Sequence, residues 1–138
     1  MNYFAGFLLI FFSVVSCQNT VDKSALKSLN GYWEIEKAVF SDGKEKEYTI
    51  NETIDFFELS GNSGYRKKMK PQFDGKYLVS GHSEKVDLQI GEKVYLHYST
   101  SFAKWKEEII KISPQNLILK NDNEVEYHYR RPVPFSIK

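Results

Sequence analysis

The residues best suited to chemistry in this 138-residue chain are one cysteine, three histidines and a few acidic pairs. Cys17 is the only cysteine, which excludes an intramolecular disulfide and a cluster of cysteine metal ligands. His82, His97 and His128 lie far apart, and none has a second ligand at the short spacing typical of metal sites. We therefore expect surface histidines, no metal and no cofactor.

Serines and carboxylates show no catalytic arrangement. The chain has no Gly-x-Ser-x-Gly segment, the sharp turn that exposes a nucleophilic serine in hydrolases. Glu107 and Glu108 would point to opposite faces of a strand, so they cannot form an acid–base pair, and we expect a solvated face. Residues 121–124 offer oxygen ligands for Ca²⁺ but lack the spaced acids of a calcium loop, which favours a polar hairpin turn. We expect that the protein is not an enzyme.

An apolar stretch, residues 4–15, leads into Cys17. It is too short to cross a ~30 Å hydrocarbon core as a helix, which needs about 20 residues, and it fits the apolar part of a secretory signal. The segment Val14-Val15-Ser16-Cys17 resembles the bacterial lipobox, in which an aliphatic and a small residue precede a cysteine that becomes lipidated. A plain secretory signal followed by a free cysteine is the alternative.

The lipobox resemblance implies three parts of the chain. Residues 1–16 would be a cleaved signal, residues 17–24 a lipidated tether, and residues 25–138 the folded domain. Two or more acyl chains hold a protein stably on a membrane, whereas one does so only marginally. Cys17 is not followed by the Asp that retains many lipoproteins in the inner membrane, which favours the outer membrane and leaves its face open.

The composition limits the partners. The formal net charge is +1, and residues 1–16 carry no Asp, Glu, Lys or Arg. The folded part is therefore near neutral, and nucleic acid is not an expected partner. Aromatic residues make up 15% of the chain, a high share that is typical of β proteins. About 120 residues are enough for one modest core, so we expect a single domain.

Turn residues and period-two alternation predict an all-β domain. Asp22 or Ser24 could cap a short helix that ends at Leu29, before Asn30-Gly31 stops it. From there about eight to ten short strands follow, and their short connections favour a closed antiparallel up-and-down barrel without free sheet edges. The predicted strands are residues 32–40, 45–50, 53–59, 65–70, 76–80, 84–90, 94–99, 103–113, 117–120 and 125–131.

Two of these strands leave alternatives open. Residues 102–112 also carry apolar side chains at helical spacing, and we prefer a strand because the surroundings are β-rich. Residues 65–70 contain the densest basic cluster, Arg66-Lys67-Lys68 with Lys70. That cluster could meet anionic headgroups or glycans, but we favour an exposed edge strand that lysines protect against aggregation.

Gly31-Tyr32-Trp33 follows the predicted helix and opens the first strand. A short helix, a Gly-x-Trp motif, a run of strands and a basic residue on the last strand resemble the lipocalins, and more specifically the small bacterial lipocalin-like lipoproteins. The resemblance covers most of the chain after the tether. It implies a lipocalin-like barrel in which Arg130 or Arg131 covers Trp33, a cation–π contact of roughly 0.5–2 kcal/mol. The supporting stretches are residues 29–35, 65–68, 73–75, 105–110 and 129–132.

The barrel interior decides between two functions. A small barrel either fills its interior with side chains or keeps room for one small ligand, and the many large side chains here favour a filled or shallow one. We expect a non-enzymatic envelope lipoprotein that holds a small apolar or amphipathic ligand at its open end. The alternative is a packed barrel that acts on an unidentified protein partner. The tyrosines that could line or plug the interior are Tyr77, Tyr95, Tyr98, Tyr127 and Tyr129.

Overall fold

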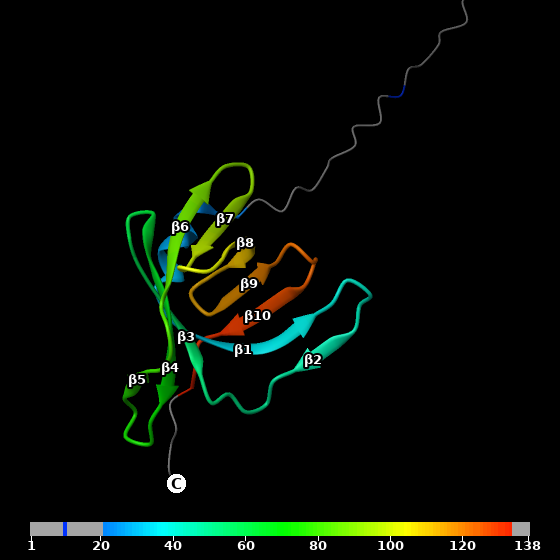
Figure 1. Ribbon diagram of the computed structural model, residues 1–138. Helices are drawn as coiled ribbons and strands as arrows, with labels where there is room; N and C mark the ends of the chain where they lie inside the picture. Colours follow the sequence, from blue (N-terminus) through cyan, green and yellow to red (C-terminus); the bar gives the residue numbers. More distant parts are fainter. Residues whose placement is uncertain (1–9, 11–20, 134–138) are drawn as a thin grey trace, which may run out of the picture.

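The computed structural model describes residue 10 and residues 21–133; Cys17 lies outside the described residues. In this part of the chain, one short 3₁₀ helix, η1 (Lys23–Leu29), precedes ten β-strands (Figure 1). The strands are β1 (Gly31–Val39), β2 (Glu45–Glu47), β3 (Ile54–Ser60), β4 (Ser63–Pro71), β5 (Tyr77–Val79), β6 (Glu84–Ile90), β7 (Val94–Ser99), β8 (Lys104–Ile112), β9 (Asn116–Lys120) and β10 (Glu126–Arg130).

Eight of the strands close into one antiparallel barrel. The order around the barrel is β1-β3-β4-β6-β7-β8-β9-β10, and β10 pairs with β1 to close it. The two remaining short strands are additions: β2 pairs with β1, and β5 pairs with β4. The predicted all-β, lipocalin-like barrel is therefore confirmed, and the segment that could have been helical is strand β8.

The short helix leads directly into the first strand. The backbone N–H of Ser24 donates to the Asp22 carboxylate at 2.9 Å, which identifies Asp22 as the N-cap. The chain leaves the helix at Asn30 and turns at Gly31, whose φ of +113° is a conformation that residues with a side chain rarely adopt. This confirms the predicted short helix and its stop, although the helix is 3₁₀ in form.

Trp33 lies at the centre of the closed end of the barrel. Its side chain is fully buried, and its indole Nε1 donates to the backbone oxygen of Leu29 at 2.8 Å, which ties the helix to β1. Inward-pointing apolar side chains from the surrounding strands pack around it, as period-two alternation requires. The most deeply buried of these are Phe57, Val86, Val94, Leu96, Ile109, Leu117 and Leu119, and Leu29 of the helix joins them.

The prediction of an exposed edge strand over residues 65–70 is wrong. Strand β4 lies inside the barrel sheet, between β3 and β6, with β5 continuing along its far end. Neither set of alternate residues in this segment, 65, 67 and 69 or 66, 68 and 70, is apolar throughout. Alternation alone therefore did not indicate which face of the strand points inward. The tight β3–β4 hairpin sets the register, because it places Arg66 opposite the core residue Phe57 and Lys68 opposite the buried Asp55.

A second, smaller apolar cluster lies on the outside of the barrel. The β4–β5 hairpin extends beyond the barrel (Figure 1), and Tyr77 from β5 stacks on Tyr32 of β1 with ring centroids 4.1 Å apart. Phe56 packs on the same Tyr32 ring at 4.7 Å. Ile54 and Met69, which pair across β3 and β4, are buried but do not belong to the main core. The hairpin thus creates an outer surface that the strand pattern did not indicate.

Candidate functional site

The structure separates the five tyrosines that were expected to share one interior. Tyr98, Tyr127 and Tyr129 lie on the inner face, in or against the core. Tyr95 lies on the outer face of β7, where the Lys106 ammonium sits 4.7 Å from its ring centroid. Tyr77 lies on the β5 hairpin, outside the barrel. Tyr77 and Tyr95 therefore do not line the barrel interior.

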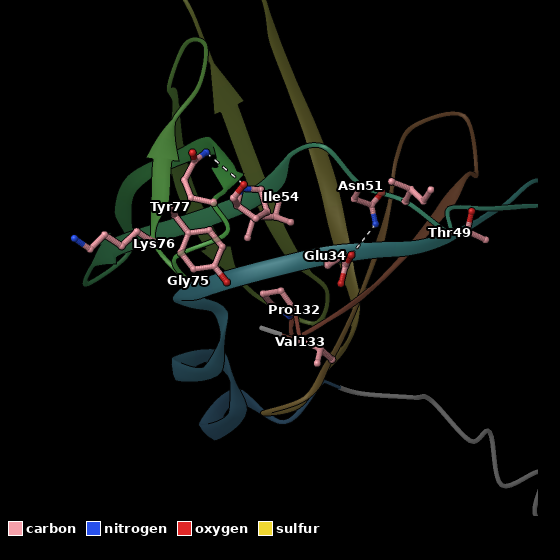
Figure 2. Close-up of a pocket in the computed structure, with 12 residues that line it drawn as sticks. Glu34, Thr49, Asn51, Ile54, Gly75, Lys76, Tyr77, Pro132 and Val133 are labelled. Carbon is pink, nitrogen blue, oxygen red and sulfur yellow. Dashed lines mark hydrogen bonds between the residues drawn. The ribbon is translucent and has the colours of Figure 1, made fainter. Parts of the chain in front are cut away.

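Tyr77 instead lines an outer groove of about 430 Å³ against β1 (Figure 2). Four segments that are distant in sequence form it: β1 at Glu34, the β2–β3 connection, the β4–β5 hairpin, and the chain after β10. Its volume lies within the range of small-ligand pockets. The lining residues are Glu34, Thr49, Ile50, Asn51, Ile54, Pro71, Gln72, Gly75, Lys76, Tyr77, Pro132 and Val133.

The structure places Arg131, and not Arg130, over Trp33. The Arg131 guanidinium carbon lies 3.6 Å from the centroid of the indole ring. Its nitrogens donate to the backbone oxygens of Tyr32 at 2.9 Å and of Pro114 at 3.0 Å, and to that of Ser28. Because a Cβ at Gly31 would lie 3.1 Å from Arg131 Nη1, the glycine also makes room for this lid. These contacts close one end of the barrel.

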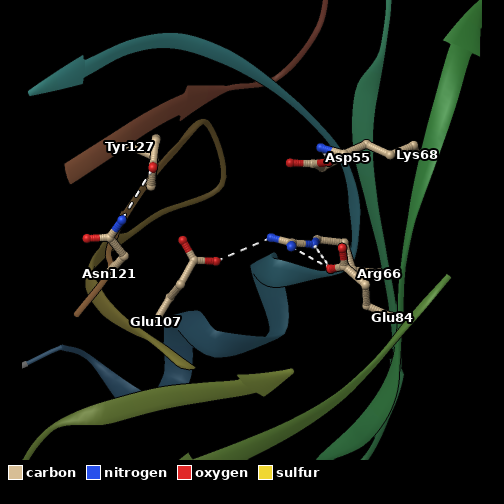
Figure 3. A network of polar contacts seen from close by, with 7 residues as sticks. All are labelled: Asp55, Arg66, Lys68, Glu84, Glu107, Asn121 and Tyr127. Atoms are coloured by element: carbon tan, nitrogen blue, oxygen red, sulfur yellow. Dashed lines mark hydrogen bonds and ion pairs between the residues drawn. The ribbon is translucent and has the colours of Figure 1, made fainter. Parts of the chain in front are cut away.

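Arg66 points inward from β4 and lies between Glu84 and Glu107 (Figure 3). We call this end of the interior, away from the Arg131 lid, the open end. Its Nε donates to a Glu84 carboxylate oxygen at 2.6 Å, and its Nη1 donates to Glu107 at 3.2 Å. The guanidinium carbon lies 4.1 Å from the ring centroid of Tyr98 and 6.0 Å from that of Phe57. The side chains of Arg66 and Glu107 are only 11% and 7% exposed, so the barrel buries a charge network here.

Two further charges extend this network towards solvent. The Lys68 ammonium donates to the buried Asp55 carboxylate, while about half of the Lys68 side chain remains exposed. We call Asp55, Arg66, Lys68, Glu84 and Glu107 the mouth network.

An aromatic pair lies beside the mouth network. Trp105 on β8 stacks on Tyr98 with ring centroids 5.5 Å apart and is partly buried.

Burial shifts the ionisation of groups in and around the mouth network. Burial raises the pKa of the Glu107 carboxyl, although the neighbouring Arg66 opposes the shift. Burial also raises the pKa of Tyr98 and Tyr129 well above the usual tyrosine value, and nearby carboxylates add to it. The Tyr98 hydroxyl is buried without a hydrogen-bond partner, and the nearby Glu107 carboxylate is one of the groups that raise its pKa. Perturbed groups of this kind are typical of functional sites.

Sequence reasoning missed the mouth network. Arg66 and Lys68 were expected on a protected edge and Glu107 on a solvated face, but all three point into the barrel. The expectation for Glu107 is wrong because β8 pairs Glu107 with the buried Leu96. The register of the β3–β4 hairpin could have indicated that Arg66 points inward. A tight turn between Ser60 and Ser63 places Arg66 directly across from Phe57.

The histidines lie outside this network. His97 contacts the Gln89 side chain at 2.6 Å, and His128 contacts Glu126 at 3.2 Å. The Asn121 side-chain oxygen accepts from two backbone N–H groups of its own hairpin turn, which occupies it in local structure. Within residues 21–133, no group of three or more histidine, cysteine, aspartate or glutamate side chains is placed to hold a metal ion.

Comparison with known proteins agrees with the barrel. The family model described as the lipocalin-like domain matches residues 29–119. A lipocalin-like protein from Bacteroides uniformis superposes with a TM-score of 0.50 at 12% identity, covering 76% of this chain and 99% of its own. An uncharacterized protein from Bacteroides eggerthii gives 0.48 at 11% identity, covering 75% and 99%. No curated protein matches the sequence. The match over residues 29–119 shows that the chain belongs to the lipocalin-like domain family.

Proposed function

We propose that this protein is a lipid-anchored envelope protein that binds a small amphipathic ligand at the open end of its barrel. The observation that carries the proposal is the mouth network. The closed half of the interior is filled with apolar side chains, and the open half carries five ionisable ones. Members of a lipocalin-like family provide the scaffold for such a site, and the family match supports a binding role.

Packing alone does not account for the mouth network. Removing charges from water costs several kcal/mol per ion, and apolar side chains of similar volume often stabilise a protein as well or better. Two of the five Arg66 N–H groups donate to Glu84 and Glu107, and Nη2 is also paired with Glu84, so the guanidinium keeps N–H donors for a ligand. Lys68 reaches solvent, so its ammonium can meet an incoming polar group.

The ligand that suits this site has an apolar body and a polar end. Trp105, which is partly buried and stacks on the buried Tyr98, supplies an aromatic surface beside the network, and aromatic faces bury apolar ligand surface effectively. The charged groups would orient the polar end. Three carboxylates face two cations in the mouth network, so a ligand with both donors and acceptors suits it better than a plain fatty chain.

Native mass spectrometry of the protein purified from its own cells, followed by organic extraction, tests the proposal. We expect a bound small molecule of defined mass. Lys68→Met should lower its occupancy, whereas Lys67→Met, the same change on the outward-facing neighbour, should leave it unchanged. If no small molecule copurifies and no amphiphile perturbs Trp105 fluorescence, ligand binding at the mouth is refuted.

The anchor is part of the same proposal. Val14-Val15-Ser16-Cys17 supports lipidation of Cys17, and the residues that follow favour the outer membrane. No helix in the described part of the chain is long and apolar enough to cross a membrane. Cys17→Ser should abolish acylation and release the protein from the membrane fraction. A mutant that still sediments with membranes and carries acyl mass would refute the anchor.

One observation favours a second candidate function, binding of a protein partner. Leu78 and Val79 on the short outer strand β5 expose more than half of their surface, and exposed apolar groups on a strand at the margin of a sheet can recruit another chain. Leu78→Asp should then weaken a crosslinked complex in intact cells. Unchanged crosslinking would remove this candidate.

A further inference from the structure

Among the residues that line the outer groove, Glu34 is the one carboxylate. Glu34 points outward from β1 into the groove, next to Asn51 (Figure 2). The Asn51 amide donates to Glu34 Oε1 at 3.1 Å and also to the backbone oxygen of Ile35, so the loop holds this carboxylate in place. The Glu34 side chain is only 19% exposed. A half-enclosed acidic group at the base of a groove is a candidate for binding a cation.

The cationic partner that Glu34 already has is weak. Arg130 Nε lies 3.5 Å from Glu34 and 3.8 Å from Glu36, so one guanidinium is shared between two carboxylates. The Arg130 side chain is 47% exposed, and solvent-exposed ion pairs of this kind contribute little. The Lys76 ammonium points away from the groove (Figure 2). Glu34 therefore retains negative charge that a better-placed cation could neutralise.

The walls of the groove are mainly apolar. Ile54 and Pro71 line one side, and Pro132 and Val133 line another. Tyr77 also lines the groove, and its ring is held by stacking on Tyr32. Burial first, and then Tyr32 and Glu34, raise the Tyr77 pKa, so the phenol is neutral and its ring remains an electron-rich face for a cation.

We infer that the outer groove is a second binding site, which takes a small organic cation with an ammonium group on an apolar body. The ammonium would pair with Glu34, and the apolar body would lie against Ile54, Tyr77 and Val133. A cavity of about 430 Å³ accommodates a molecule of this class. The site lies on the opposite face of the barrel wall from the mouth network and does not depend on the function proposed for it.

Three probes of matched size and different charge test the inference. Benzylamine, benzyl alcohol and benzoate would be titrated into the purified full-length protein and followed by NMR chemical shifts. We expect benzylamine to bind about tenfold more tightly than benzyl alcohol, and benzoate not to bind. Equal affinity for the three probes, or no binding of benzylamine at millimolar concentration, would overturn the inference.

Two variants identify the carboxylate. Glu34→Gln should reduce the benzylamine affinity to that of benzyl alcohol, whereas Glu58→Gln, the same change at an exposed position of β3, should not alter it. Arg130→Gln should strengthen benzylamine binding, because Glu34 loses its competing cation. Benzylamine binding that survives Glu34→Gln, or that weakens in Arg130→Gln, would contradict the assignment. Lys68→Met at the mouth should leave benzylamine binding unchanged, which separates this site from the mouth.

Discussion

The two ends of the barrel interior differ in the side chains that fill them: one is apolar and the other is charged. At the closed end, Trp33 lies among apolar side chains, and Arg131 covers its ring from outside. At the open end, the same inward alternation places Arg66 and Glu107 where apolar residues would otherwise lie. The closed end gains stability from removal of apolar surface from water. The open end carries charges that are costly to bury, which is why the proposed binding site is placed there.

Trp33→Ala should have the largest effect on stability. It deletes a fully buried indole and the hydrogen bond to Leu29, and the truncated side chain leaves a cavity at the closed end. We expect a loss of about 3–5 kcal/mol in the free energy of unfolding, measured by urea denaturation. An unchanged urea midpoint would mean that the closed end does not contain the main core.

Arg66→Met tests the open end and should rank next. It leaves Glu84 and Glu107 without their cation inside the barrel, which costs about 3 kcal/mol. Replacing Glu84 and Glu107 by methionine and leucine in the same chain should recover most of that loss, because no unpaired charge then remains. A triple variant as unstable as Arg66→Met would show that the network itself stabilises the barrel.

Arg131→Met should have a moderate effect at the closed end. It removes the contact with the Trp33 ring and the bonds to backbone oxygens, for a loss of about 1–2 kcal/mol. Arg130→Met is the matched control, since its exposed pairs with Glu34 and Glu36 are worth about 0.5 kcal/mol or less. Equal losses in the two variants would contradict the lid role of Arg131.

The smallest effect should be a pH dependence that is specific to Glu107. Because burial raises its pKa in the folded protein, the folded state binds this proton more tightly than the unfolded state. The contribution of Glu107 to stability is therefore highest at low pH and falls as pH rises from the ordinary value of 4.5 through the folded pKa. Urea melts across this range should show a fall in wild type that Glu107→Gln lacks; identical profiles would place Glu107 in solvent.

Alternation and turn residues were sufficient to predict most of the fold. The helix stop at Asn30-Gly31, the start of β1 just before Trp33, and strand β8 all follow from local pattern. The reason is that each of these segments has one clearly apolar face or a residue with special backbone freedom. Strand β4 lacks such a face, and its assignment as an edge was wrong because the partner strand, and not its own residues, sets its orientation.

The candidate sites were less accessible to sequence reasoning. Tyr98, Tyr127 and Tyr129 lie inside, but Tyr77 and Tyr95 do not, because the β4–β5 hairpin bends outward and β7 alternates its faces. The outer groove joins segments from β1 to the chain after β10, and no local spacing brings them together.

The sequence by itself determined a β-rich chain headed by Gly31 and Trp33, because steric preferences and hydrophobic periodicity act over neighbouring residues. Which arginine covers Trp33, which charges enter the barrel, and where Glu34 meets the 132–133 segment were decided only by the tertiary structure. Adjacent residues of a strand face opposite sides, and the closure of the barrel and the register of its strands choose between them.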